Sequence, residues 1–280
     1  MRLSTSDHDR DAAGLTYVYP VVSRRARGVS IGINLNPNDA CNFRCVYCQV
    51  PGLGYGNAPE LHPLLLERQL ADFLDQALAG DWMERFVPEG SRVLRDIAFS
   101  GNGEPTSSEQ LPEVVAIVGR LLAQRGQLGK LKLVLITNGS LVHRGHVRRA
   151  LELFAPLAGE VWFKLDSATS EGQARINSYK GGLERVRTNL RLAASLCPTW
   201  IQTCVFDWNG PPSAAERAAY LAFLSAERAA GTPLSGVLLY GLARESHQPE
   251  APELSPLPAE WLEALAEEIR ALGLEVRVSP

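Results

Sequence analysis

Short β-rich runs alternate with longer amphipathic runs along most of this chain, and this alternation is what most restricts its fold. Strands joined by helices lie parallel, because the chain must cross back over the sheet before the next strand begins. We expect strands at residues 29–35, 96–100, 132–137, 160–166, 199–206 and 236–240, and a short closing strand at 274–278. The expected helices cover residues 64–78, 111–123, 145–154, 183–196, 213–229 and 258–272.

Six strand–helix repeats are too few for a closed eight-fold barrel. We therefore predict an α/β fold, an incomplete (β/α)6 TIM-like barrel with parallel strands. The 280 residues suit one domain of this kind, so we expect a single domain over residues 1–280. Residues 1–16 are expected to be a flexible N-terminal segment, and the Pro-rich stretch 247–258 a surface connection.

The charge balance limits the classes of partner. Lys and Arg number 28 and Asp and Glu 31, a formal charge of −3, which argues against a generally polyanion-binding surface. The basic run 143–149 has two open interpretations: contact with RNA phosphates, or a solvated helix face. The sequence shows neither a signal-peptide pattern nor a long apolar run, so we expect a cytoplasmic protein without membrane contact.

Three cysteines are crowded into one short loop, where Cys41, Cys45 and Cys48 read C-x3-C-x2-C. Three thiolates on a tight loop suit a four-iron cluster in which one iron lacks a protein ligand. A structural zinc ion usually takes four protein ligands, so the zinc alternative needs a fourth, such as His62 or a distant cysteine. Incidental core cysteines are the other alternative. The loop therefore favours a [4Fe-4S] cluster bound by these three residues.

A Gly-rich loop, GNGEPT, follows the expected strand 96–100 and contains Gly101, Gly103 and Glu104. Asn138 follows the expected strand 132–137. Because the carboxyl ends of parallel strands meet at one edge, these residues should lie on the same face as the cysteine loop. The alternative interpretation is that GNGEPT and the Asn138-Gly139 pair are simple turns.

The two-residue period of the expected strand 160–166 puts Lys164 and Asp166 on its inner face, together with Trp162. A buried Lys and Asp without partners are costly, so they should either pair with each other or bind something. On the expected strand 199–206 we favour Gln202 as the inward residue over Thr203.

Four further residues carry weaker expectations. Tyr240 and Arg244, near the end of the sixth strand, are expected to contact adenine or substrate. Cys197 and Cys204 are expected to be buried free cysteines, since other ligands for a second cluster are lacking nearby.

Tyr47 occupies the aromatic position of C-x3-C-x-φ-C, and with this loop the sequence resembles the radical S-adenosylmethionine (SAM) superfamily. GNGEPT resembles its GGEP element, with Asn102 in place of one glycine. The resemblance implies that SAM chelates the open iron through its amino and carboxylate groups. One electron then cleaves SAM to methionine and a 5′-deoxyadenosyl radical, which abstracts hydrogen from a substrate.

The resemblance also implies roles for individual residues. It gives the cofactor-binding set as Tyr47, Gly101, Gly103, Glu104, Asn138, Lys164 and Gln202, with Glu104 on the amino group of SAM. The catalytic candidates are Lys164 and Asp166. A flavodoxin or ferredoxin is the implied electron donor.

A narrower resemblance covers residues 17–278. The segment VVSRRARGVSIGIN at 21–34, together with FSGNGEPT, LITNGSL, LDSAT and LLYGLARESHQPE, resembles the wyosine-synthase-like Fe-S oxidoreductases. Wyosine synthases themselves remodel a tRNA guanosine with pyruvate and carry a further cluster with its own N-terminal cysteines. Since no cysteine precedes Cys41 here, neither tRNA nor pyruvate is carried over.

The expected function is therefore a radical SAM enzyme that acts on a small molecule or nucleoside. The alternatives are an activating enzyme that installs a glycyl radical on a partner protein, or tRNA base modification. A non-catalytic Fe-S or zinc module would need neither Glu104 nor a SAM pocket.

Overall fold

The computed structural model describes residues 3, 14–23, 26 and 28–280. Most of the expected N-terminal segment, residues 1–16, and Arg24, Arg25 and Arg27 of the family-like segment lie outside the described residues. No helix in the described part of the chain is long and apolar enough to cross a lipid bilayer.

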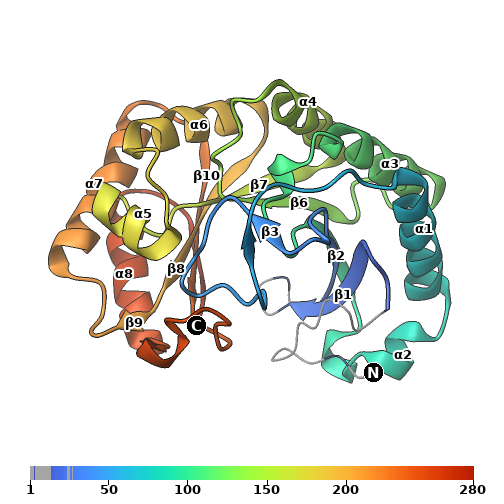
Figure 1. Ribbon diagram of the computed structural model, residues 1–280, viewed down its shortest axis with the longest axis horizontal. Coiled ribbons are helices and arrows are strands. Elements are labelled where there is room, and N and C mark those ends of the chain that lie inside the picture. Colours follow the sequence, from blue (N-terminus) through green and yellow to red (C-terminus); the bar gives the residue numbers. More distant parts are fainter. Residues whose placement is uncertain (1–2, 4–13, 24–25, 27) are drawn as a thin grey trace.

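A curved eight-stranded sheet forms the centre of the molecule, in the order β1-β2-β5-β6-β7-β8-β10-β12 (Figure 1). The seven strands from β2 to β12 run parallel, and β1 pairs antiparallel with β2. Their bounds are β1 Val18–Ser23, β2 Gly28–Ile33, β5 Leu94–Phe99, β6 Lys132–Thr137, β7 Gly159–Lys164, β8 Thr199–Val205, β10 Leu234–Gly241 and β12 Val276–Ser279. The sheet does not close on itself, so β1 and β12 are its two edges. The predicted incomplete TIM-like barrel is confirmed.

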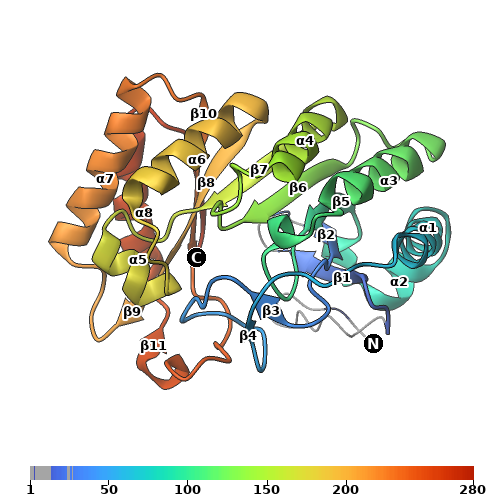
Figure 2. The same cartoon turned by 45° about the horizontal axis from the view of Figure 1, so that its top comes forward.

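The connecting helices lie on the outer side of this sheet (Figures 1 and 2). They are α1 Pro63–Ala79, α3 Leu111–Gln124, α4 Gly145–Phe154, α6 Leu183–Leu196, α7 Ala214–Ala229 and α8 Ala259–Ala271. Each packs through apolar residues spaced three or four apart, as with Val114, Val118 and Leu121 of α3. Their core partners are the outward residues of the strands, so Phe99 of β5 meets Phe154 of α4 at 5.1 Å between ring centroids. The six predicted helices are confirmed within a few residues at each end.

The sequence prediction missed the antiparallel strand β1. All but the last of its residues are buried, and Val18 pairs with Ile33 while Ser23 pairs with Gly28. The run reads as continuously apolar, which does not distinguish an edge strand from a loop that packs on the core. The strand extends the sheet beyond β2 and adds Tyr19 to the inner surface.

A short helix after β7, α5 Ser170–Asn177, was also missed, because its polar sequence has almost no apolar stripe. Thr169 caps it by accepting a hydrogen bond from the Gly172 amide. The remaining short elements are α2 Trp82–Phe86, the pair β3 Ala40–Cys41 and β4 Gly54–Tyr55, the pair β9 Asp207–Trp208 and β11 Leu254–Ser255, and four 3-10 turns at Glu89–Ser91, Pro105–Ser107, Ala155–Leu157 and Ala251–Glu253.

Candidate functional site

The cysteine loop lies between β2 and α1, across the carboxyl ends of the parallel strands (Figure 2). Its backbone is bound to the end of α5, where the Val46 amide donates to the Ile176 carbonyl at 2.9 Å and the Arg44 amide to the Asn177 carbonyl at 3.2 Å. Asn42 ties it to the turn after β6 by donating to Ser140 Oγ at 2.8 Å. Hydrogen bonds to α5 and to the turn after β6 thus fix the loop.

The C-terminal connection fixes the same loop from the other side. Ser246 Oγ donates to the Val46 carbonyl at 2.7 Å, and the His247 amide donates to the Cys48 carbonyl at 2.9 Å. Gln248 also donates to the Val50 carbonyl at 3.3 Å. Most of the Pro-rich stretch 247–258 is exposed, as expected of a surface connection, but Gln248 within it and Ser246 just before it are buried against the cysteine loop.

Two glycines bring the Gly-rich loop against this assembly. Gly101 has φ 152°, and a Cβ there would lie 2.4 Å from Asn34 Oδ1. At Gly103 a Cβ would lie 2.0 Å from the Ala40 carbonyl oxygen, just before the first loop cysteine. Only glycine permits these two close approaches.

Glu104 ends that loop as a buried carboxylate, 2 % exposed. Its Oε1 accepts hydrogen bonds from the Thr106 amide, the Thr106 hydroxyl and the Thr137 hydroxyl, and its Oε2 accepts one from the Asn138 amide at 2.7 Å. Burial raises the pKa of this carboxyl above its usual value, although the four donors oppose the shift. Glu104 therefore joins the loop to the end of β6 while it lines the cavity described below.

Lys164 and Asp166 lie at the end of β7 but do not hydrogen-bond to each other among the described contacts. Lys164 Nζ donates to the Tyr240 hydroxyl at 3.1 Å and stands 4.8 Å from the centroid of the Tyr47 ring. Burial is the largest single influence and opposes its charge, but Asp166, Tyr240, Cys45 and Cys204 together outweigh it and hold the pKa of Lys164 well above its usual value. Lys164 is therefore a cation, and it lines the cavity described below.

The Asp166 carboxylate is surrounded by donors of other elements. It accepts hydrogen bonds from the Tyr47 hydroxyl, from Asn177 Nδ2 at 2.8 Å and from the Cys204 amide at 2.9 Å. It lines a neighbouring pocket beside α5 and α7 and does not line the cavity that holds the cysteines. Asp166 thus reaches the cysteine loop through Tyr47 and Asn177.

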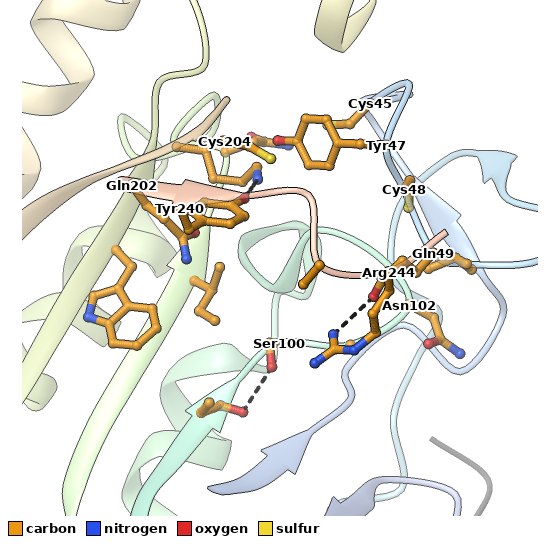
Figure 3. A pocket seen from close by; sticks show the side chains of 18 of the residues that line it. Cys45, Tyr47, Cys48, Gln49, Ser100, Asn102, Gln202, Cys204, Tyr240 and Arg244 are labelled. Carbon is orange, nitrogen blue, oxygen red and sulfur yellow. Dashed lines mark hydrogen bonds between the residues drawn. The ribbon is translucent and has the colours of Figure 1, made fainter. Parts of the chain in front are cut away.

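Gln202 is buried in β8 with 1 % of its surface exposed, and its Oε1 has no hydrogen-bond partner. It faces the cavity (Figure 3), whereas Thr203 turns to the helices and meets the Tyr220 hydroxyl at 2.6 Å. The prediction that Gln202 is the inward residue is confirmed. An unpaired buried acceptor is unfavourable unless something else supplies a donor.

One cavity of about 300 Å³ brings most of the predicted site residues together. Its lining includes Cys41, Cys45, Tyr47, Cys48, Gly101, Gly103, Glu104, Asn138, Lys164 and Gln202. Tyr240, Arg244 and Cys204 line it as well, whereas Cys197 is buried elsewhere and Sγ–H donates to the Gly159 carbonyl. Residues from separate strands and loops thus converge on one space, which lies at the lower end of the size range of small-molecule sites.

Two of the loop thiols, Cys41 and Cys45, are protonated until a metal binds. Burial raises the pKa of Cys41 to about 12, with help from the Glu104 carboxylate, and burial raises that of Cys45 to about 11. Metal ligation requires thiolates, so loading must release these protons. Among the described residues, no three Cys, His or carboxylate side chains are placed to hold a single metal ion. A cubane cluster does not need three ligands around one metal ion, because each thiolate binds a different iron.

Sequence reasoning missed several residues that position the loop. Asn177 donates to Cys45 Sγ at 3.3 Å as well as to Asp166, and Phe43 stacks on Tyr179 at 4.9 Å between ring centroids. Ser246 and Gln248 belong to the same group. Their partners are far away in the sequence, and most of the bonds go to backbone atoms, which leave no residue pattern to find.

Comparison with known proteins agrees with this geometry. A sequence model of the radical SAM superfamily matches residues 35–210, more than half of the chain, and the chain belongs to this superfamily. It is therefore an enzyme of that superfamily, whose cofactors are a [4Fe-4S] cluster and SAM.

Two curated relatives are the UPF0026 protein slr1464 of Synechocystis and the UPF0026 protein MJ1312 of Methanocaldococcus jannaschii. The first is 34 % identical over 60 % of this chain and 54 % of its own length, and the second 27 % identical over 56 % and 42 %. The chain thus matches about half of each relative.

Among solved structures, one of TYW1 with a lysine-pyruvate adduct bound is similar with a TM-score of 0.56. The two are 16 % identical, and the match covers 88 % of this chain and 74 % of that one. This likeness supports the barrel fold alone.

Proposed function

We propose that Cys41, Cys45 and Cys48 bind the [4Fe-4S] cluster and that SAM lies in the cavity beneath it. When bound, the cluster supplies the electron that cleaves SAM to methionine and a 5′-deoxyadenosyl radical. The observation that carries this proposal is the single cavity lined by three thiols, the Glu104 carboxylate, the Lys164 ammonium and the unpaired oxygen of Gln202. The donor types fit the two cofactors, since thiolates suit iron and the polar groups complement a zwitterionic amino acid.

Each residue that lines the cavity has its own role in this proposal. Glu104 holds the amino group of SAM and Lys164 its carboxylate, while Asn138 and Gln202 hydrogen-bond its ribose or the substrate. Gly101 and Gly103 let the loop approach closely, and Tyr47 closes one wall beside Lys164. Asp166 acts through the Tyr47 hydroxyl, which it orients.

The substrate we propose is a small molecule or nucleoside. Strand register supports it, because Lys164 pairs with Gln202 while Trp162 and Ile136 lie further from the cysteine loop and also line the cavity. The cavity thus extends beyond Lys164 and Gln202, on the side away from the cysteine loop.

Activation of a glycyl-radical enzyme is the second candidate, and the open side of the barrel favours it. The cavity reaches Tyr19, Val21 and Ser23 of one edge strand and Ser279 of the other. A backbone segment of a partner protein could enter between these edges. Co-purification with a glycyl-radical enzyme, or its gene next to this one, would separate this candidate from the first.

The decisive experiment is anaerobic reconstitution with iron and sulfide, followed by dithionite and SAM, with chromatography for 5′-deoxyadenosine. We expect the product from the wild type and from Cys197→Ala, whose thiol lies outside the cavity. Cys41→Ala, Cys45→Ala and Cys48→Ala should each lose both cluster and product. A Cys45→Ala protein with full iron and sulfide content would contradict the assignment.

A further inference from the structure

A group of exposed cations lies beside the cysteine loop, formed by Arg144, Lys180 and Arg185 with His143 among them; we call it the basic rim. Arg144, Lys180 and Arg185 make no ion pair among the described residues. The neighbouring carboxylate is already used, since Glu184 pairs with Arg187 at 3.4 Å. The rim therefore presents uncompensated positive charge on a chain whose formal charge is −3.

The members of the basic rim come from two connections but lie close together. Asn189 of α6, one helical turn after Arg185, donates to the Gly139 and Ser140 carbonyls at 2.8 and 3.2 Å, so the start of α6 lies against the turn that leads to His143 and Arg144. In keeping with this, Arg185 and Arg144 add to the effect of burial that holds the pKa of His143 below its usual value. Burial raises the pKa of the Tyr179 hydroxyl, and the charge of Arg185 partly opposes this rise. Lys180 directly follows that tyrosine in the sequence. The first two residues of the basic run 143–149 thus join a second basic group that only the fold brings to them.

The rim surrounds an aromatic contact that leads to the cluster loop. Tyr179 stacks on Phe43 at 4.9 Å and 29° between ring planes. Phe43 lies between two of the cysteines, and its amide donates to Cys41 Sγ at 3.4 Å. Asn42 fixes the loop to the turn that begins the rim through Ser140. A partner docked here would be separated from the cluster ligands by two side chains.

The rim also leaves the cavity free. Phe43 lines the cavity, but none of the four rim residues does. A partner bound to the rim would therefore contact the outer side of the cluster loop without displacing SAM or substrate. This is the arrangement that an electron donor needs and that a substrate does not.

We propose that the basic rim is the docking surface for an acidic one-electron carrier protein of the flavodoxin class, an inference that rests on the proposed function. The carrier is oxidised by one electron and the cluster is reduced by one, with no bond made or broken at the contact. Uncompensated cations attract an acidic partner and speed its association. RNA is less well suited, because its affinity grows with the number of phosphates that are neutralised and this patch is small.

The test compares Lys180→Glu and Arg185→Glu with Lys130→Glu, an exposed lysine between α3 and β6 that makes no ion pair among the described residues. All three variants change the net charge by the same amount. Two quantities are measured on reconstituted protein: the Kd for flavodoxin at low and high salt, and the rate of 5′-deoxyadenosine formation with either reduced flavodoxin or dithionite. We expect the rim variants to weaken flavodoxin binding and the flavodoxin-driven rate roughly tenfold at low salt, with less effect at high salt. The dithionite-driven rate should not change.

Three results would overturn the proposal. The first is that the rim variants do not differ from Lys130→Glu in flavodoxin affinity. The second is that they lose the dithionite-driven rate while their flavodoxin affinity stays the same. The third is that they lose retention of tRNA on a filter while flavodoxin binding is unaltered, which would assign the rim to RNA. If the wild type cleaves no SAM with either reductant, the proposed function fails, and the flavodoxin Kd still decides whether the rim is a docking surface.

Discussion

Replacing Glu104 by glutamine separates the structural role of this carboxylate from its role in binding SAM. The side chain keeps its size but loses its charge. One oxygen can still accept the three hydrogen bonds of Oε1. The new amide nitrogen then faces the Asn138 amide, which now donates to Oε2 at 2.7 Å. Two donors cannot bond each other, so this bond is lost.

The size of each effect follows from the kind of bond. A hydrogen bond to a charged group contributes about 1.5–3 kcal/mol, and the Asn138 amide would remain buried without an acceptor. We therefore expect a loss of about 2–3 kcal/mol in the free energy of unfolding. If Glu104 also binds the SAM ammonium, loss of that second charged bond should raise the Kd for SAM roughly 10- to 100-fold.

Thr137→Val is the matched control, because it removes one donor to Glu104 and keeps the carboxylate. It should destabilise by about 1–2 kcal/mol and leave the Kd for SAM close to the wild-type value. Guanidinium unfolding gives the stabilities, and equilibrium dialysis of reconstituted protein gives the SAM affinity. If Glu104→Gln binds SAM as well as the wild type does, the carboxylate is purely structural and the reasoning is refuted. Equal losses of affinity in both variants would also refute it, since they would reflect loop distortion.

Three further predictions test other parts of the structure. Gln202→Leu removes the unpaired acceptor, so guanidinium unfolding should show unchanged or higher stability, by up to about 1–2 kcal/mol, while affinity for SAM or substrate falls; a lower stability would mean that the acceptor has a partner in the fold. Gly103→Ala should lower the iron and sulfide content after reconstitution, because its Cβ would meet the Ala40 carbonyl at 2.0 Å, whereas Gly90→Ala enters open space and should load normally. Glu227→Gln should cost about 3 kcal/mol at neutral pH, because the buried carboxylate binds Arg187 and Arg191. Burial raises the pKa of Glu227, but these arginines and Thr232 outweigh it and hold the pKa below its usual value. Its contribution is therefore complete above about pH 4.3 and lost as the pH falls further, so wild type and variant should converge in acid; a constant difference down to low pH would contradict this.

Much of the fold could be predicted because its periodicities are local. The apolar runs that become β6 and the stripes that become α4 and α6 are set by residues close to each other in the sequence, so their bounds agree with the structure. The antiparallel β1 and the polar helix α5 could not be predicted, since the first depends on pairing with β2 and the second on contacts with the cysteine loop. The single-domain expectation stays a prediction.

The sequence by itself determined the chemistry that this chain can offer: three thiols at C-x3-C-x2-C spacing, a carboxylate after two close glycines, and a lysine on an inward strand position. Residue type and short spacing suffice for this, because both are written directly in the chain. Only the tertiary structure decided that these groups share one cavity. It also decided that the Glu104 carboxylate accepts four hydrogen bonds and that the side-chain oxygen of Gln202 has no partner. It also joined Arg144 to Lys180 and Arg185 in the basic rim. These properties are sums over contacts between distant segments, and such contacts exist only once the sheet has curved and the loops have met at its carboxyl edge.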